Sequence, residues 1–100
     1  MASATEVLAY LRGHMMRTDG SGVRYTAWYA GIATDARQRL FGEHNVSHSQ
    51  GKWTYKACNS EPEARSVEKA LLDLGCKGGP RGGDRLRYVY VYKITPTTKE

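Results

Sequence analysis

The clearest secondary-structure signal in the chain is LRYVYVYKI, at residues 86–94. Aromatic and β-branched residues fill this stretch, and Tyr88, Tyr90 and Tyr92 alternate with valines. Because successive side chains of a strand point to opposite faces, we predict a strand with a tyrosine face and a valine face.

A second strand is predicted at 23–32, VRYTAWYAGI, which is also rich in aromatic and β-branched residues. Trp28 and Tyr29 fall on opposite faces of it, so both faces should be largely buried. The polar residues at 45–52 indicate a loop, and a short third strand should follow at 53–58.

Ser60 marks the start of a helix, with Pro62 in the first turn and Glu63 at the third position. Gly75 should end this helix. The apolar stripe that would pack on the sheet comprises Ala64, Val67, Leu71 and Leu74.

A shorter helix should follow the strand at 23–32. Thr34 or Asp35 would cap its N-terminus, and Gly42 would end it. This order of elements places a short helix directly after a buried strand.

The N-terminal segment 1–16 supports two interpretations. Its apolar residues recur at helical spacing, and Ser3 and Glu6 are placed to form a capping box, which favours a helix. The alternative is a strand that closes a hairpin through the turn-rich residues 18–22. The sequence leaves both open.

These elements predict one α+β domain with a central, mostly antiparallel sheet of about three or four strands flanked by helices. A chain of 100 residues has the common size of a single domain. Residues 1–22 would form an N-terminal extension, and residues 95–100 would form a frayed polar tail.

Lysine and arginine outnumber aspartate and glutamate by 15 to 10, which gives a net charge of +5. A basic surface favours a polyanionic partner through counterion release and electrostatic steering. Cys58 and Cys76 show no disulfide framework, so we expect a reducing, cytoplasmic environment. No apolar run is long enough to cross a bilayer, and we expect no membrane association.

The residues with the most chemical information surround the end of the second predicted strand. Tyr29 and Gly31 lie in that strand, Arg39 follows ten residues after Tyr29, and His44 comes next. Downstream, Glu68 lies at the border of the apolar stripe of the last predicted helix and should face the sheet. Phosphodiester hydrolysis needs groups that orient water, stabilise negative charge and hold a divalent metal, and these residue types supply all three.

This pattern resembles the signature of the GIY-YIG nuclease superfamily over residues 23–75. Tyr29 matches the tyrosine of the second family motif, Gly31 its glycine and Arg39 its arginine, while Glu68 matches the glutamate of the third motif. The resemblance implies an endonuclease dependent on Mg²⁺ (or Mn²⁺) that hydrolyses phosphodiester bonds by a single-metal mechanism, in DNA more than in RNA.

The same resemblance implies a role for each residue. Tyr29 would activate the attacking water, Arg39 would stabilise the pentacovalent charge, and Glu68 would anchor the metal near the leaving oxygen. His44 would serve as a proton acceptor or as a phosphate contact. Taken singly, these residues also fit ordinary roles, such as a core tyrosine or an arginine paired with Glu43 at a gain of about 0.2–0.5 kcal/mol.

The chain departs from the family pattern in two places. The first motif, a glycine-isoleucine-tyrosine strand, is absent where the family has it, but the strand at 86–94 is similar to it, with Tyr90 matching its tyrosine. That would be a circularly permuted domain, which requires this strand to lie beside the strand at 23–32. In addition, the family histidine follows the arginine one residue sooner, whereas His44 lies five residues after Arg39.

Further basic residues are candidates for phosphate contact: Arg37, Lys52, Lys56, Arg81, Arg85 and Arg87. The chain is too short for a separate recognition domain, so cutting would depend on DNA structure or on a protein partner that supplies specificity. Two rival functions stay open. One is a catalytically inactive nucleic-acid-binding protein on the nuclease scaffold, and the other is a small regulator that binds another protein.

Overall fold

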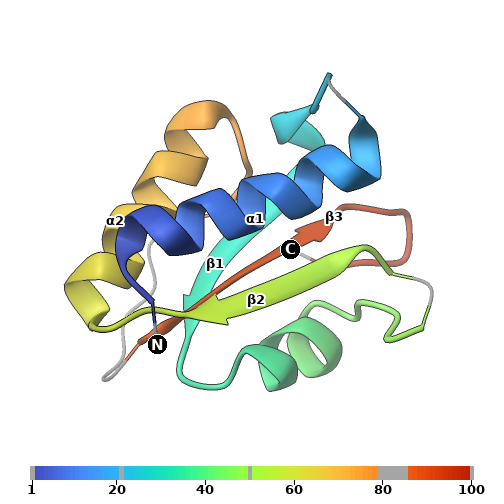
Figure 1. The fold of residues 1–100 in the computed structure, drawn as a ribbon. Coiled ribbons are helices and arrows are strands. Elements are labelled where there is room, and N and C mark those ends of the chain that lie inside the picture. Colours follow the sequence, from blue (N-terminus) through green and yellow to red (C-terminus); the bar gives the residue numbers. More distant parts are fainter. Residues whose placement is uncertain (1, 21, 50, 79–85, 100) are drawn as a thin grey trace.

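A three-stranded antiparallel sheet with the strand order β1-β3-β2 forms the centre of the molecule (Figure 1). The structure, a computed structural model, describes residues 2–20, 22–49, 51–78 and 86–99. In chain order the elements are α1 (Ala4–Asp19), η1 (Tyr25–Ala27), β1 (Trp28–Ala33), η2 (Gln38–Glu43), β2 (Trp53–Ala57), α2 (Glu61–Leu74) and β3 (Tyr88–Lys93). The predicted α+β class is confirmed.

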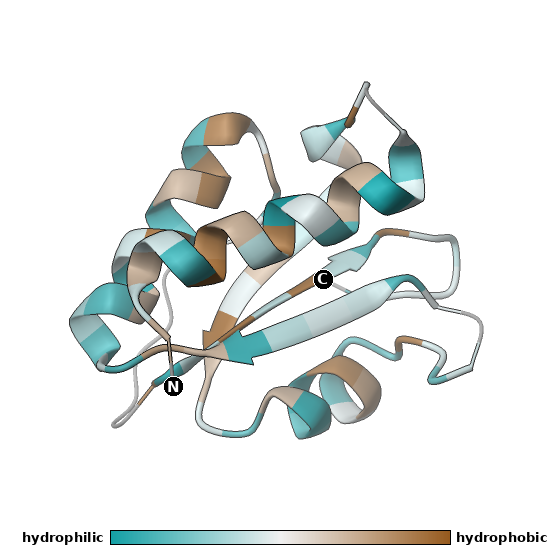
Figure 2. Cartoon of the chain, in the orientation of Figure 1, coloured by the Kyte–Doolittle hydropathy of each residue, from teal (hydrophilic) through white to brown (hydrophobic). Residues whose placement is uncertain are grey.

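The two faces of the sheet carry different layers. Helices α1 and α2 lie together on one face, and the short helix η2 lies on the other (Figure 1). Along α1, hydrophobic and hydrophilic residues alternate in the way expected of a helix buried on one side (Figure 2). Trp28 packs in the core beneath α1 and α2, whereas its neighbour Tyr29 packs in a second core on the η2 face. The opposite orientation predicted for these two side chains is confirmed.

Strand β3 is the central strand. Gly31 of β1 lies directly opposite Tyr90 of β3, and Tyr55 of β2 lies opposite Tyr90 from the other side. The C-terminal strand is therefore the neighbour of β1, which is the adjacency that a circularly permuted domain requires. The two faces predicted for β3 are also present, because Tyr90 and Val91 belong to different cores.

Strand β1 is shorter than predicted. Residues 25–27 form a turn of 3-10 helix, in which the Ala27 N–H donates to the Arg24 carbonyl at 2.9 Å. Gly75, at the end of α2, lies against Tyr25. Packing at this corner of the molecule outweighs the local β propensity, which is set largely by context.

The capping signals predicted both long helices. Ser3 and Glu6 form the capping box of α1, so the helical interpretation of the N-terminus is confirmed and the hairpin is wrong. Ser60 caps α2, and Gly75 follows it with a positive φ of 119°. Leu74 was expected in the buried stripe but is exposed, since it lies in the last turn. Among the described residues, no helix is long and apolar enough to cross a membrane.

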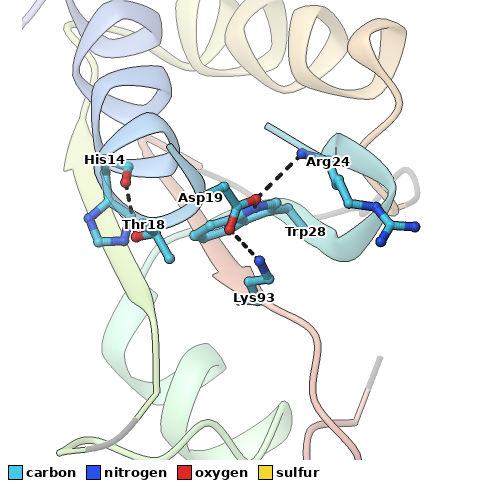
Figure 3. A network of polar contacts seen from close by, with 6 residues as sticks. All are labelled: His14, Thr18, Asp19, Arg24, Trp28 and Lys93. Carbon is cyan, nitrogen blue, oxygen red and sulfur yellow. Dashed lines mark hydrogen bonds and ion pairs between the residues drawn. The ribbon is translucent and has the colours of Figure 1, made fainter. Parts of the chain in front are cut away.

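A polar network ties the end of α1 to the sheet (Figure 3). The buried Asp19 carboxylate accepts a hydrogen bond from the Trp28 indole N–H at 2.9 Å and forms an ion pair with Lys93 of β3. It also accepts from the Arg24 N–H at 3.4 Å. Burial raises the pKa of Asp19, but the hydrogen bonds from Lys93, Trp28 and Arg24 outweigh it, so the pKa lies below its ordinary value.

We expect Asp19→Asn to lower the free energy of unfolding at pH 7 by about 2 kcal/mol, because a charged hydrogen-bond partner is lost. A carboxylate whose pKa is lowered by folding stabilises the fold at pH values above its unfolded-state pKa, which is near 3.9. This contribution to the free energy of unfolding is lost as the pH falls through the pKa of the folded state. The difference in the free energy of unfolding between the unaltered chain and Asp19→Asn should therefore become smaller below about pH 4. Urea unfolding at pH 7 and pH 3 measures it, and an equal loss at both values would contradict the charge-based explanation. Asp73→Asn, on an exposed ion pair, is the control.

Candidate active site

Four aromatic side chains gather on the η2 face of the sheet and form what we call the tyrosine–histidine cluster: Tyr29, His44, Tyr90 and Tyr92. The Tyr29 ring lies 4.7 Å from the His44 ring and 5.2 Å from the Tyr92 ring, measured between centroids. His44 is only 1 % exposed and Tyr29 is 7 % exposed. Three of the predicted site residues, Tyr29, His44 and Tyr90, are therefore brought together.

Hydrogen bonds hold the His44 ring from both sides. Its Nδ1 lies 2.6 Å from the Lys99 carbonyl oxygen, and its Nε2 lies 2.8 Å from the Tyr90 hydroxyl. Because a carbonyl can only accept, Nδ1 carries the proton, and in the neutral ring Nε2 accepts from the Tyr90 O–H. The Tyr92 O–H also donates to the Lys99 carbonyl, at 3.2 Å. A base that is hydrogen-bonded to a hydroxyl and oriented by a third group is the arrangement that activates a hydroxyl.

Helix η2 positions His44 through an unusual backbone. It is a π-helix, and the His44 N–H donates to the Arg39 carbonyl, five residues earlier, at 2.9 Å. The predicted helix was expected to end at Gly42 but continues to Glu43 in this wider form. A π-helix turn absorbs one additional residue, so a spacing of five here leaves His44 one turn beyond Arg39. Such turns occur frequently at functional sites.

Arg39 has one buried donor that no other described residue satisfies. Its Nε lies 3.4 Å from a Glu43 carboxylate oxygen, so the predicted alternative of an Arg39–Glu43 pair is present. The side chain is 19 % exposed, and its Nη1 has no hydrogen-bond partner among the described residues. A buried donor without a partner is costly and calls for a ligand, and an anion is the ligand that a guanidinium prefers.

Gly31 makes room for Tyr90. A Cβ atom at this position would overlap the Tyr90 ring and hydroxyl, and that ring is fully buried. The glycine of the predicted motif is therefore needed for close approach between β1 and the tyrosine that bonds to His44.

We expect Gly31→Ala to displace Tyr90 from His44 and to lower the free energy of unfolding by about 1–3 kcal/mol, the usual cost of overpacking. Urea unfolding would measure the loss. The matched control is Gly22→Ala, since nothing lies within 4 Å of a Cβ atom there. Equal stability of the two variants would contradict the packing role of Gly31.

Glu68 is positioned by a different layer. It lies on α2 and is 6 % exposed, which agrees with its predicted place at the border of the apolar stripe. Helix α2 packs on the face that carries Trp28, across the sheet from the tyrosine–histidine cluster. After α2 the chain runs along the outer edge of β1, where the Ala30 N–H donates to the Lys77 carbonyl at 2.8 Å. Glu68 thus comes from the helix nearest the edge strand that carries Tyr29, but not from the same face.

The candidate protein ligand for a metal ion is a single carboxylate, that of Glu68. Within the part of the chain that the structure describes, no three or more histidine, cysteine, aspartate or glutamate side chains are grouped so that they could hold a metal ion. A single carboxylate completed by water is a donor set that Mg²⁺ accepts, because this ion keeps much of its hydration shell. Glu68 would be the protein ligand.

The other basic candidates divide between the two faces. Arg37 is on the η2 face, with its guanidinium 5.3 Å from the Phe41 ring centroid and 3.3 Å from His48 Nε2. Lys56 lies 4.9 Å from the ring of Tyr10 on α1, and therefore on the opposite side. Burial, then the charges of Arg17 and Lys52, lower the pKa of His14 on α1. Lys52 itself is exposed, just before β2. Arg87 is exposed just before β3, while Arg81 and Arg85 fall outside the described residues.

The C-terminal segment contributes two contacts that the sequence did not indicate. The Lys99 N–H donates to the His44 carbonyl at 2.7 Å, and the Asn45 side-chain amide donates to the Thr97 carbonyl at 2.9 Å. The prediction of a frayed tail is therefore wrong for residues 95–99. Their backbone covers His44 and orients its ring.

The remaining residue that sequence reasoning missed is Tyr92, because only Tyr90 of the row Tyr88, Tyr90 and Tyr92 was assigned to the site. Its hydroxyl lies 3.1 Å from His44 Nδ1.

Comparisons with models of protein families, with curated proteins and with solved structures found no match to this chain.

Proposed function

We propose that the chain is a Mg²⁺-dependent endonuclease of the GIY-YIG type that hydrolyses phosphodiester bonds in DNA. The observation that carries this proposal is the His44–Tyr90 hydrogen bond of 2.8 Å one helical turn from Arg39, whose buried Nη1 has no partner among the described residues. A polarised hydroxyl and an available cation are two of the groups that attack on a phosphate diester needs.

Burial favours one of the two roles considered for His44. With 1 % of its surface exposed, this ring is too enclosed to contact a phosphate, but its Nε2 is the acceptor for the Tyr90 hydroxyl. We propose that His44 acts as a proton acceptor through Tyr90: the attacking water gives a proton to the Tyr90 oxygen as the Tyr90 proton passes to Nε2. Tyr90 is also fully buried, so the water would have to enter beside Tyr29, which is 7 % exposed. The Lys99 carbonyl stabilises the resulting imidazolium through Nδ1–H, as an oriented acceptor does in other hydroxyl–histidine pairs.

The remaining groups act on the phosphate. Tyr29 orients the attacking water through its hydroxyl, and Arg39 stabilises the charge that develops on the pentacovalent phosphorus. Because α2 packs on the other face of the sheet, Glu68 would hold Mg²⁺, together with water, at the outer edge of β1 and not within the tyrosine–histidine cluster. The bound ion would supply Lewis-acid stabilisation of the phosphoryl and leaving oxygens.

The net charge and the two cysteines support a polyanionic partner and a reducing environment. A net charge of +5 favours a polyanion, with binding that weakens steeply as salt rises. Both cysteines are free and buried, and burial raises the pKa of Cys76 to about 11, which keeps its thiol unreactive. These features fit a reducing cytoplasm.

The test is incubation of the purified chain with plasmid DNA, branched DNA and RNA, with Mg²⁺ or Mn²⁺ and with a chelator. We expect internal cuts in DNA that require the metal and disappear with the chelator. Salt-sensitive binding without any cut would instead indicate an inactive nucleic-acid-binding protein. Absence of both would favour a protein-binding regulator.

A further inference from the structure

Beside the tyrosine–histidine cluster lies a second group of rings, here called the aromatic row: Phe41, Trp53, Tyr55 and Tyr88. The Phe41 and Trp53 centroids are 4.8 Å apart, those of Trp53 and Tyr55 6.1 Å, and those of Tyr55 and Tyr88 5.9 Å. Trp53 and Tyr55 are nearly parallel, with 9° between their planes. All four rings are only partly buried, so parts of them are open to a ligand.

One end of the aromatic row opens into a cleft of about 360 Å³, lined by Thr34, Asp35, Ala36, Arg37, Tyr55 and Tyr88. This volume is within the range of small-ligand sites. Two of its walls are aromatic, and Arg37 supplies a cation. Asp35 lines the cleft as well, and one of its oxygens accepts from the Gln38 N–H at 3.1 Å.

The lining chemistry fits a nucleobase better than a phosphate. A carboxylate repels phosphate but accepts hydrogen bonds from the N–H groups of a base edge. Aromatic rings stack on the face of any base, irrespective of sequence. Arg37 then lies where it can neutralise the phosphate attached to that base.

The cleft is next to the candidate active site. Tyr55 lies directly opposite Tyr90 in the sheet, and Tyr88 is two residues from Tyr90 on the same face of β3. Neighbouring strands are about 4.8 Å apart, and alternate residues of one strand about 7 Å apart. These separations are close to the spacing of adjacent nucleotides, so a base in the cleft would belong to a nucleotide near the reacting phosphate.

We infer that the substrate strand is unpaired beside the cleavage site, with one base inserted in this cleft against Tyr55 and Tyr88. In a continuous duplex both faces of each base are covered by its neighbours, so only an unpaired base can present its face to these rings. The preferred substrate is therefore single-stranded DNA or the unpaired strand of a branch. This inference deepens the proposed function and rests on it.

Binding of the full chain to three fluorescent probes tests the inference: oligo(dT), an abasic strand of the same length, and a hairpin duplex. We expect tighter binding to oligo(dT) than to either other probe. Tyr88→Leu and, independently, Tyr55→Leu should each weaken oligo(dT) binding about tenfold, as loss of a stacking contact does. Tyr10→Leu, an exposed tyrosine on α1, is the matched control and should change little.

Quenching of tryptophan fluorescence by oligo(dT) gives a readout that needs no variant, and we expect it with the unaltered chain. Of the two tryptophans Trp28 is fully buried, so a stacked base would quench the partly exposed Trp53. Equal affinity for all three probes, with no quenching, would overturn the inference while metal-dependent cutting of duplex still supported the nuclease. Selective oligo(dT) binding without cleavage of any DNA would contradict the proposed nuclease activity and still support a base-binding cleft.

Discussion

Tyr29→Phe is expected to lower the rate of metal-dependent DNA cleavage by about 10²- to 10⁴-fold, the usual contribution of a positioned acid–base group. The substitution removes only the hydroxyl that we propose orients the attacking water. The ring would keep its contacts with His44 and Tyr92, at centroid distances of 4.7 and 5.2 Å. Stability and DNA affinity should therefore be nearly unchanged.

Initial rates of plasmid nicking at saturating Mg²⁺ measure this loss. The matched control is Tyr25→Phe, which removes a hydroxyl from η1, next to the end of α2 and away from the tyrosine–histidine cluster. A Tyr29→Phe protein that cuts as fast as this control would show that the phenol has no chemical role.

Glu68→Gln has the second large expected effect. Glutamine keeps the size of this buried side chain but replaces the charged carboxylate that would hold Mg²⁺. We expect cleavage to fall about 100-fold or more, because a bound cation contributes several kcal/mol of charge stabilisation. DNA affinity in the absence of metal should stay the same.

Measurement of Mn²⁺ binding distinguishes a role of Glu68 as a metal ligand from a purely structural role. In the unaltered chain Mn²⁺ should bind and raise the unfolding midpoint, since a ligand of the folded state stabilises it. Glu68→Gln should abolish that shift, whereas Asp73→Asn, an exposed carboxylate on the same helix, should preserve it. An equal Mn²⁺ shift in both variants would exclude Glu68 as the ligand.

Local chemistry was sufficient to predict most elements of this fold. The Ser3–Glu6 capping box and the Ser60 cap define where α1 and α2 begin, because a helix leaves N–H groups that only such side chains satisfy. Strict alternation was sufficient to orient β3, with Tyr90 and Val91 in different cores. The adjacency of β1 and β3 followed from the family resemblance alone.

Contacts between residues that are distant in the sequence account for the features of the site that the sequence did not predict. The Lys99 carbonyl holds His44 across 55 positions, and no sequence pattern marks it because every residue has a carbonyl. The π-helix turn likewise depends on its surroundings, since Asn45 after it adopts a positive φ of 56° and is bonded to the C-terminal segment. Helical periodicity placed Glu68 at a buried border, but periodicity does not tell which face of the sheet a helix covers.

The most direct measurement is a crystal structure of the Tyr29→Phe chain with Mn²⁺ and a short single-stranded DNA. We predict an anomalous peak for Mn²⁺ at the Glu68 carboxylate, with the ion coordinated to a phosphate oxygen that also accepts a hydrogen bond from Arg39. A metal ion at Glu68 with the DNA bound on the α1 side of the sheet, or a phosphate at Arg39 with no metal within reach, would contradict it.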